Sequence, residues 1–388
     1  MITLPKSNLP IGILLFSKIL FLFVMIHLAF AVIVFLVVRL LIATINLLTR
    51  QWLPHSKSSG NSKVSVLIPA RNEAHNIRHL LNGLLEQDYQ FWEAIVYDDL
   101  SEDDTADIVL SYQKRDARIR LVQGSVLPEG WLGKNFGCHQ LAKHAKGEYL
   151  LFIDADVRLD KTLIDDAVAH FEKHKLELLS IFPQQIMVSW GEKVSVPIMN
   201  WVLVSLLPLI LTKVSANPAF AAANGQHMLF KAATYRPMQF HERFKTHAVE
   251  DISIAKYMKH QKLRTHTLLS NGQIKCRMYG SLKEAIGGFS KNVLAFFGNS
   301  IPLSIIILLT TTFGIIPVYL AFGTSAALSY LAISLLLRTL VAFISKQNAL
   351  FNIILAPVQQ IVFCIMITKA IYNRHKRRNT WKGRIINT

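Results

Sequence analysis

The sequence is poor in cysteine and in charged residues, and its acids are outnumbered by its bases. The three cysteines, Cys138, Cys276 and Cys364, are far apart and in no metal-ligand spacing, which argues against a disulfide framework and a zinc-finger-like site. Only 17% of the 388 residues are charged, and 42 basic against 25 acidic residues give a net charge of +17. This excess suits an anionic lipid surface or a nucleic acid. Because the basic residues flank apolar segments and accompany no base-reading motif, no nucleic acid partner is expected.

A long apolar run begins the chain. Residues 11–48 contain Lys18 and Arg39 as their only charges, and the run exceeds the roughly 20 residues that cross a bilayer. Basic residues follow it, which places the next part of the chain in the cytoplasm. We therefore expect a membrane anchor over residues 1–50 and a short linker over 51–63.

Apolar segments return in the C-terminal third, at 301–322, 328–344 and 351–371, before a basic tail over 373–388. Three crossings would put this tail outside, whereas a cytoplasmic tail requires two. The segment that contains Arg338 is the expected non-spanning one, because a charge inside a bilayer is costly. The prediction is a membrane region over 299–372 in a multi-pass protein of the cell membrane.

Two further segments have the character of surface helices. Residues 194–214 are apolar, and one crossing there would separate Asp154 from Asp251, so a helix in the cytoplasmic leaflet is expected. Residues 281–298 carry apolar side chains on one helical face and lysines elsewhere, which predicts an amphipathic helix at the membrane surface.

Between these parts, residues 64–280 alternate strand and helix patterns. Apolar strands are expected at 64–69, 93–97, 119–122 and 149–153. Strands that alternate with helices predict an α/β domain with a mostly parallel sheet.

Paired acids follow the strand at 149–153. In extended backbone Asp154 and Asp156 point the same way, and two close carboxylates favour a cation such as Mg²⁺ or Mn²⁺ between them. A strand end with a solvated acidic turn is the alternative. Asp98 and Asp99 close another strand, where they suit a nucleotide at the carboxyl edge of the sheet or the cap of the next helix.

The order of these motifs resembles the inverting GT-A glycosyltransferases of family 2. The motifs are Pro69-Ala70-Arg71-Asn72-Glu73, Asp98-Asp99-x-Ser101, Asp154-x-Asp156 and Glu250-Asp251. Flanking residues resemble the membrane-bound branch that glycosylates lipids such as carotenoids and hopanoids: Gly130-Trp131-x-Gly133-Lys134, Arg277-Met278-Tyr279 and Trp381-Lys382-Gly383-Arg384. The resemblance implies a Rossmann-like mixed sheet in a cytoplasmic domain with N- and C-terminal transmembrane helices.

The resemblance also implies roles by position. The residues expected to bind a UDP-sugar are Pro69, Ala70, Arg71, Glu73, Asp98, Asp99, Lys134, Asp154, Arg277, Trp381 and Arg384. Lys134 and Arg277 would lie near the diphosphate, and Trp381 and Arg384 would close over the site from the membrane side. Asp154 and Asp156 would hold the metal. Asp251, beside Glu250, would be the catalytic base, although acids in the first turn of a helix are also ordinary partners of its dipole.

These expectations combine into a metal-dependent transferase that moves a sugar, with glucose the commonest donor sugar in the branch, to a membrane lipid acceptor. A polyprenyl-phosphate or polysaccharide-synthase type of glycosyltransferase is an alternative. A non-catalytic lipid-binding scaffold with the same fold is a second one.

Overall fold

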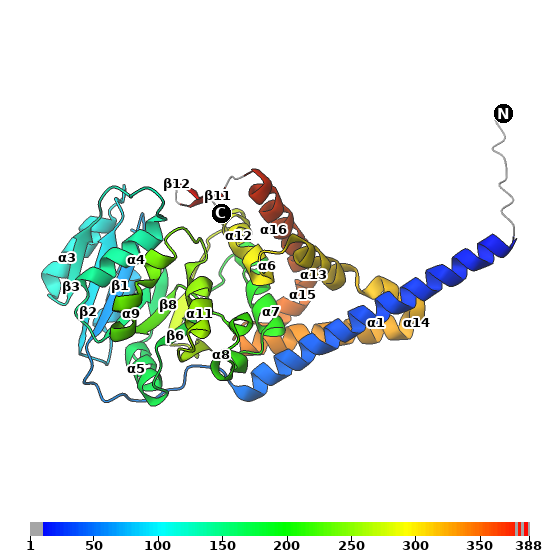
Figure 1. Cartoon of the computed structure of the whole chain (residues 1–388), viewed down its shortest axis with the longest axis horizontal. Coiled ribbons are helices and arrows are strands. Elements are labelled where there is room, and N and C mark those ends of the chain that lie inside the picture. The colour runs from blue at the N-terminus through cyan, green and yellow to red at the C-terminus, as the bar shows by residue number, and fades with distance from the viewer. Residues whose placement is uncertain (1–10, 377–378, 382–383, 387–388) are drawn as a thin grey trace.

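The computed structural model describes residues 11–376, 379–381 and 384–386. Figure 1 shows a body built on a β-sheet, which contains the middle of the chain, and an extension made of long helices from both ends of the chain.

The body is organised around a seven-stranded sheet in the order β3-β2-β1-β4-β8-β6-β9. The strands are β1 (Val64–Ala70), β2 (Trp92–Asp98), β3 (Ile119–Gln123), β4 (Tyr149–Ile153), β6 (Leu178–Phe182), β8 (His227–Lys231) and β9 (Thr265–Leu269). β8 is antiparallel to both β4 and β6, whereas the other neighbouring strands are parallel. The sheet is therefore mixed, and the strands predicted from the sequence are confirmed.

Alternate residues of β1 enter two different hydrophobic cores. Val64, Val66 and Ile68 pack with one set of helices, and Leu67 packs with the other. The first set is α2 (Ile77–Leu85), α3 (Thr105–Arg115) and α5 (Leu163–Lys173), and the second is α4 (Gly133–His144), α9 (Ala232–Met238), α10 (Phe240–Arg243) and α11 (Glu250–His260). A strand covered on both faces needs an unbroken apolar run, which explains the sequence of β1.

A three-stranded sheet lies beside the end of β4. It consists of β5 (Val157–Leu159), β10 (Ile274–Cys276) and β7 (Gln184–Gln185), in the order β5-β10-β7. Because β10 pairs with β5, the residues after Cys276 are brought near the acids that follow β4. Near the C-terminus, β11 (Asn379–Trp381) and β12 (Arg384–Ile386) form an antiparallel pair.

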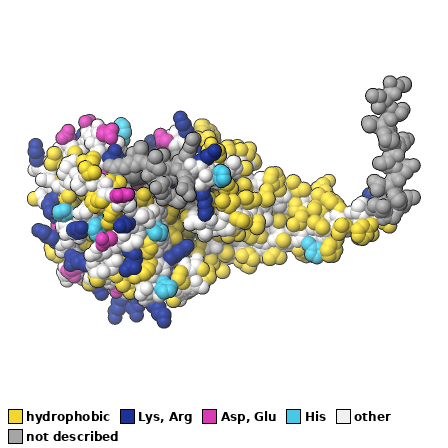
Figure 2. All heavy atoms as spheres, turned by 45° about the horizontal axis from the view of Figure 1, so that its top comes forward, with side chains coloured by type: hydrophobic (Ala, Val, Ile, Leu, Met, Phe, Trp, Pro, Cys, Tyr) yellow, Lys and Arg dark blue, Asp and Glu magenta, His cyan; other side chains and the backbone are white. Residues whose placement is uncertain are grey.

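In the extension, α1 (Ile11–Thr49) and α14 (Ile315–Ile344) lie side by side (Figure 1). Apolar side chains cover the surface of this part (Figure 2), including Phe16 and Leu328, which are 68% and 61% exposed. Within the described residues, two helical stretches are long and apolar enough to cross a membrane, Leu15–Thr49 and Ile301–Ile344. The second joins α13 (Ile301–Phe313) to α14 and contains a non-helical residue, Gly323, at φ 80°.

The predicted membrane region over 299–372 forms helices of very different length. The Arg338 segment belongs to the candidate span that ends at Ile344. The helices after it, α15 (Ala349–Ile354) and α16 (Ala356–Lys376), do not qualify in the described chain. α16 packs on other helices instead and buries Gln359, whose side chain contacts Asn352 and the carbonyl of Lys193.

The two predicted surface helices are also corrected. Residues 194–214 belong to three short helices, α6 (Trp190–Ser195), α7 (Pro197–Leu206) and α8 (Ile210–Val214), rather than one. The buried residues of α6 and α7 pack on α1, α14 and α16, and α8 packs beside β9. The amphipathic segment forms α12 (Leu282–Asn292) and the 3₁₀ turn η2 (Val293–Phe297), and its apolar face packs on α6 and α16. Amphipathicity identified a buried face correctly but not the surface that covers it. A second 3₁₀ turn, η1 (Pro218–Phe220), precedes β8.

Candidate active site

A cavity of about 1380 Å³ lies at the carboxyl edge of the sheet. The predicted site residues that line it are Pro69, Ala70, Arg71, Glu73, Asp99, Lys134, Asp154, Asp156, Glu250 and Asp251. They come from the ends of β1, β2 and β4 and from the starts of α4 and α11. Since β1, β2 and β4 are parallel, their carboxyl ends meet at one edge, where ligands of open α/β sheets bind.

Lys134 joins acids from two distant parts of the chain. Its Nζ lies 2.8 Å from Asp154 Oδ1 and 3.5 Å from Glu250 Oε1. Gly225 allows this close approach, because a Cβ at that position would lie 2.9 Å from Lys134 Nζ and 3.4 Å from Glu250 Oε1. A side chain there would have to displace the lysine. The cluster therefore combines a strand end, two helix starts and a glycine that keeps the loop before β8 close.

The surroundings of Asp156 disfavour the ionised form of its carboxyl group. Burial, followed by the neighbouring carboxylates of Asp154 and Glu73, raises the pKa of Asp156 to about 7. The amide Nε2 of Gln226 lies 3.4 Å from its Oδ1. A buried carboxylate beside two others is stabilised by a cation, so the donor set at Asp154 and Asp156 fits a divalent ion such as Mg²⁺ or Mn²⁺.

Asp251 is held rigidly at the start of α11. Its Oδ2 accepts a hydrogen bond from the backbone N–H of Gly225 at 2.9 Å, and its Oδ1 accepts one from Ile252 at 2.7 Å. Burial nevertheless raises the pKa of Asp251, and burial raises the pKa of Glu250 to about 7. A higher pKa makes the ionised carboxylate a stronger base, so both acids suit proton transfer.

Hydrogen bonds join the two segments that carry the residues expected to bind the nucleoside, one at the end of β1 and the other after β2. Arg71 Nη1 donates to the backbone carbonyls of Asp99 and Leu100, at 2.5 and 3.0 Å, and the N–H of Asp99 donates to Ala70. Asp98 does not line the cavity. Its carboxylate accepts hydrogen bonds from the backbone of Ser101 and from the side chain of Gln123. These contacts stabilise the turn that follows β2.

A model of the family described as glycosyl transferase family 2 matches residues 65–231. This part of the chain is a family 2 glycosyltransferase domain. A 4,4'-diaponeurosporenoate glycosyltransferase of Staphylococcus haemolyticus (strain JCSC1435) is 25% identical over 347 residues, which is 83% of this chain and 88% of the relative. A poly(ribitol-phosphate) beta-N-acetylglucosaminyltransferase of Staphylococcus aureus (strain Mu50 / ATCC 700699) is 34% identical over 122 residues, 31% of this chain but only 20% of the relative.

The fold has a solved counterpart in a mannosyltransferase from Pyrobaculum calidifontis, which was solved in complex with GDP-Man and Mn²⁺. The TM-score is 0.57 at 18% identity, over 90% of this chain and 99% of that one. The GT-A fold predicted from the sequence is therefore confirmed, and residues 65–231 of this fold match the family 2 glycosyltransferase model.

Of the three residues predicted to bind the donor from flanking motifs near the C-terminus, the structure describes the side chain of Arg277 alone. Arg277 of the glycosyltransferase does not line the cavity, and its Nε pairs with Glu192 Oε1 at 2.8 Å. Its neighbours Met278 and Tyr279 do line the cavity. Trp381 and Arg384 face each other in the backbone register of β11 and β12, and their side chains lie outside what the structure describes.

The cavity has a second end that sequence motifs did not reveal. Its apolar lining comes from Met199, Leu203 and Leu206 of α7, from Phe289 of α12 and from Phe296 of η2. Lys291 and Lys369, on α12 and α16, also line it. Burial and then the charge of Lys369 lower the pKa of Lys291. The amphipathic pattern of 281–298 was the available signal, but the pattern did not show that this face borders a cavity.

Proposed function

We propose that this glycosyltransferase moves a sugar, glucose being the expected one, from a UDP-sugar to a membrane lipid with inversion at the anomeric carbon. The observation that supports it best is the two-ended cavity. Acids at its sheet end suit a nucleotide diphosphate with a metal, and the apolar lining from α7, α12 and η2 suits a lipid.

Asp154 and Asp156 would hold the divalent ion at the sheet end. A bound ion supplies stabilisation of the negative charge that develops on the departing diphosphate. Lys134, which already contacts Asp154, supplies a protein cation at the same place. Arg71, Glu73 and Asp99 would position the nucleoside.

Asp251 would accept the proton of the attacking acceptor hydroxyl. The hydroxyl oxygen forms a bond to the anomeric carbon, the bond from that carbon to the diphosphate oxygen breaks, and UDP leaves. The two backbone N–H groups on Asp251 keep its carboxylate aimed into the cavity. A single displacement of this kind inverts the anomeric carbon and needs no enzyme nucleophile.

A lipid acceptor is supported by the helices that border the cavity. The relative aligned over most of both chains is named for diaponeurosporenoate, which favours the carotenoid class. Because a carboxylic acid of that class is already ionised near neutral pH, the base Asp251 fits a hydroxyl-bearing member better. We further propose that α1 crosses the membrane and that α13 and α14 form a hairpin that enters it. Figure 1 shows α13 leading away from the body towards the far end of α14. α16 would then lie at the cytoplasmic surface, which keeps the basic tail on the side of the catalytic domain.

The test is release of UDP by purified, detergent-solubilised protein. A panel of UDP-sugars and GDP-mannose is offered with Mn²⁺, Mg²⁺ or EDTA, with and without a lipid extract. We expect metal-dependent release from one donor, stimulated by lipid and reduced at least about 100-fold in Asp156→Ala, because charge stabilisation at the leaving group is lost. Asp107→Asn, which changes an exposed acid on α3, is the matched control.

Failure of every nucleotide sugar in the presence of lipid would contradict the proposal. Transfer from a polyprenyl-phosphate sugar under the same conditions would then identify the alternative donor class. Donor binding without turnover under any of these conditions would support the non-catalytic scaffold.

A further inference from the structure

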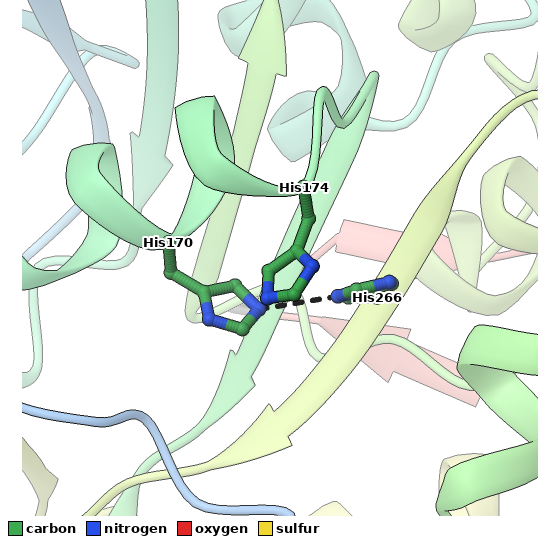
Figure 3. Close-up of side chains that lie close together, drawn as sticks. All are labelled: His170, His174 and His266. Atoms are coloured by element: carbon green, nitrogen blue, oxygen red, sulfur yellow. Dashed lines mark hydrogen bonds between the residues drawn. The ribbon is translucent and has the colours of Figure 1, made fainter.

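Three histidines converge at the edge of the sheet opposite β3. His170 lies on α5, His174 directly follows that helix, and His266 is the second residue of β9 (Figure 3). His170 Nε2 and His266 Nδ1 are 3.1 Å apart, and one nitrogen from each of the three rings lies within 4.8 Å of the others. His170 and His174 are four positions apart, the spacing that places two side chains on one helical face.

The directions of the strands show that this histidine cluster is separate from the carboxylates of the active site. β9 is parallel to β6, and both run in the same direction as β4, because β8 is antiparallel to β4 and to β6. His266 is near the beginning of its strand, whereas Asp154 follows the end of β4. The two sites therefore lie at opposite ends of the strands.

The donor set suits a transition metal. His170 and His266 are buried, and their facing ring nitrogens share one proton in a hydrogen bond. A metal ion would replace this hydrogen bond if the proton moved to the other nitrogen of the donor ring. Imidazole nitrogens suit Zn²⁺, Cu²⁺ and Ni²⁺ rather than Mg²⁺. Two tetrahedral ligands at about 2.0–2.1 Å from Zn²⁺ are separated by about 3.3 Å, close to the distance between His170 and His266.

We propose that His170, His174 and His266 bind one zinc ion and leave its fourth position to water. The ion would join the end of α5 to the edge strand β9. β9 also receives the linker that follows α1, since the N–H of Leu53 donates to the carbonyl of Leu269. Zinc would therefore stabilise the edge strand that, at its other end, receives the linker from α1.

Two features of the histidine cluster oppose tight zinc binding. Positive charges of Lys173 and Lys213 act on His170 and His174 and oppose a dication. His170 Nδ1 is buried without a hydrogen-bond partner in the described part of the chain, whereas metal-bound histidines usually donate their second N–H. The lysine effect can be tested, because Lys213 is exposed on α8 and can be replaced without disturbing a core.

The test is metal titration of full-length protein purified without a polyhistidine tag, freed of metal, and kept in excess Mn²⁺ to occupy oxygen-ligand sites. We expect one Zn²⁺ per chain, a higher melting temperature on binding, and visible Co²⁺ absorption of a nitrogen-ligated, low-coordinate site. His174→Gln should reduce the affinity at least about 10-fold. Lys213→Gln should increase it.

His79→Gln is the matched control, because His75 and His79 have the same four-residue spacing, are exposed, and belong to no cluster of three among the described residues. Equal zinc affinity in the wild-type protein, His174→Gln and Lys213→Gln would overturn the proposal. So would loss of binding in His79→Gln alone. If His174→Gln fails to fold, an unchanged affinity in Lys213→Gln together with the absence of a visible Co²⁺ spectrum would do the same.

Discussion

The two ends of the cavity are built in different ways. At the sheet end, parallel strands deliver Asp99, Asp154 and Asp156 to one edge, so short motifs in the sequence are enough to place them together. At the helical end, Leu203, Lys291 and Lys369 come from helices separated widely along the chain. We infer that the sheet end acts on the donor and performs the chemistry, and that the helical end selects the acceptor.

The largest effect expected at the sheet end is that of Asp251→Asn. Loss of the base should reduce transfer to a hydroxyl acceptor by about 10²–10⁴-fold, the usual contribution of general base catalysis. A carboxylic acid acceptor is already ionised near neutral pH, so ester formation should decrease much less. The measurement is kcat on a matched pair of lipid acceptors, one alcohol and one acid. An unchanged rate on the alcohol would contradict the assignment of Asp251 as base.

The helical end should respond through acceptor binding instead. Lys291 and Lys369 line the cavity close to each other, and an anionic group on the acceptor would relieve their repulsion. Lys291→Gln and Lys369→Gln should each raise KM for an anionic lipid acceptor by about 10-fold, equivalent to about 1.4 kcal/mol, with KM for the donor unchanged. The control is Lys283→Gln, which changes an exposed lysine on the same helix. An increase in the donor KM would contradict the inference that the helical end binds the acceptor alone.

The same contrast explains what could be predicted from the sequence. Buried strands and the acids that follow them are local patterns, so the positions of the strands and of Asp154 and Asp156 at a strand end follow from the sequence alone. The partner of an apolar helical face is not a local property. The pattern of residues 281–298 predicted an amphipathic helix at the membrane surface but did not reveal that α6 and α16 cover its apolar face. Pairing of His266 with two histidines at α5 likewise requires the arrangement of strands and helices.

Buried arginines on the helices also depend on partners that are distant in the sequence. Arg338 indicated a segment that avoids the membrane, because its charge is expensive in lipid. In the structure its guanidinium donates to Gln359 at 2.7 Å and lies 4.9 Å from the ring centre of Trp201. Arg39 lies on the same ring system at 4.0 Å. Partners that are distant in the sequence thus accommodate both arginines inside the helical part.

Arg277 precedes the cavity-lining residues Met278 and Tyr279, and its replacement gives the smallest expected effect. Its pairing with buried Glu192 lowers the pKa of that carboxyl, against the opposing effect of burial. A lowered pKa contributes stability that is present above the ordinary pKa of glutamate and is lost as the pH falls through the folded-state value. Because Arg277 is partly exposed and solvent screens the pair, Arg277→Gln should cost only about 1 kcal/mol at pH 7, seen as a melting temperature a few degrees lower.

The deficit of Arg277→Gln should shrink as the pH falls below the ordinary pKa of glutamate and through the lowered pKa of Glu192, because Glu192 of the wild-type protein then also becomes protonated. Melting curves at pH 7 and at acidic pH, together with the donor KM, distinguish the two roles of this arginine. A stability loss with an unchanged donor KM places Arg277 in the scaffold that orients α6 and the helical end. A raised donor KM with an unchanged melting temperature would instead assign Arg277 to binding of the donor diphosphate, as its sequence motif implied.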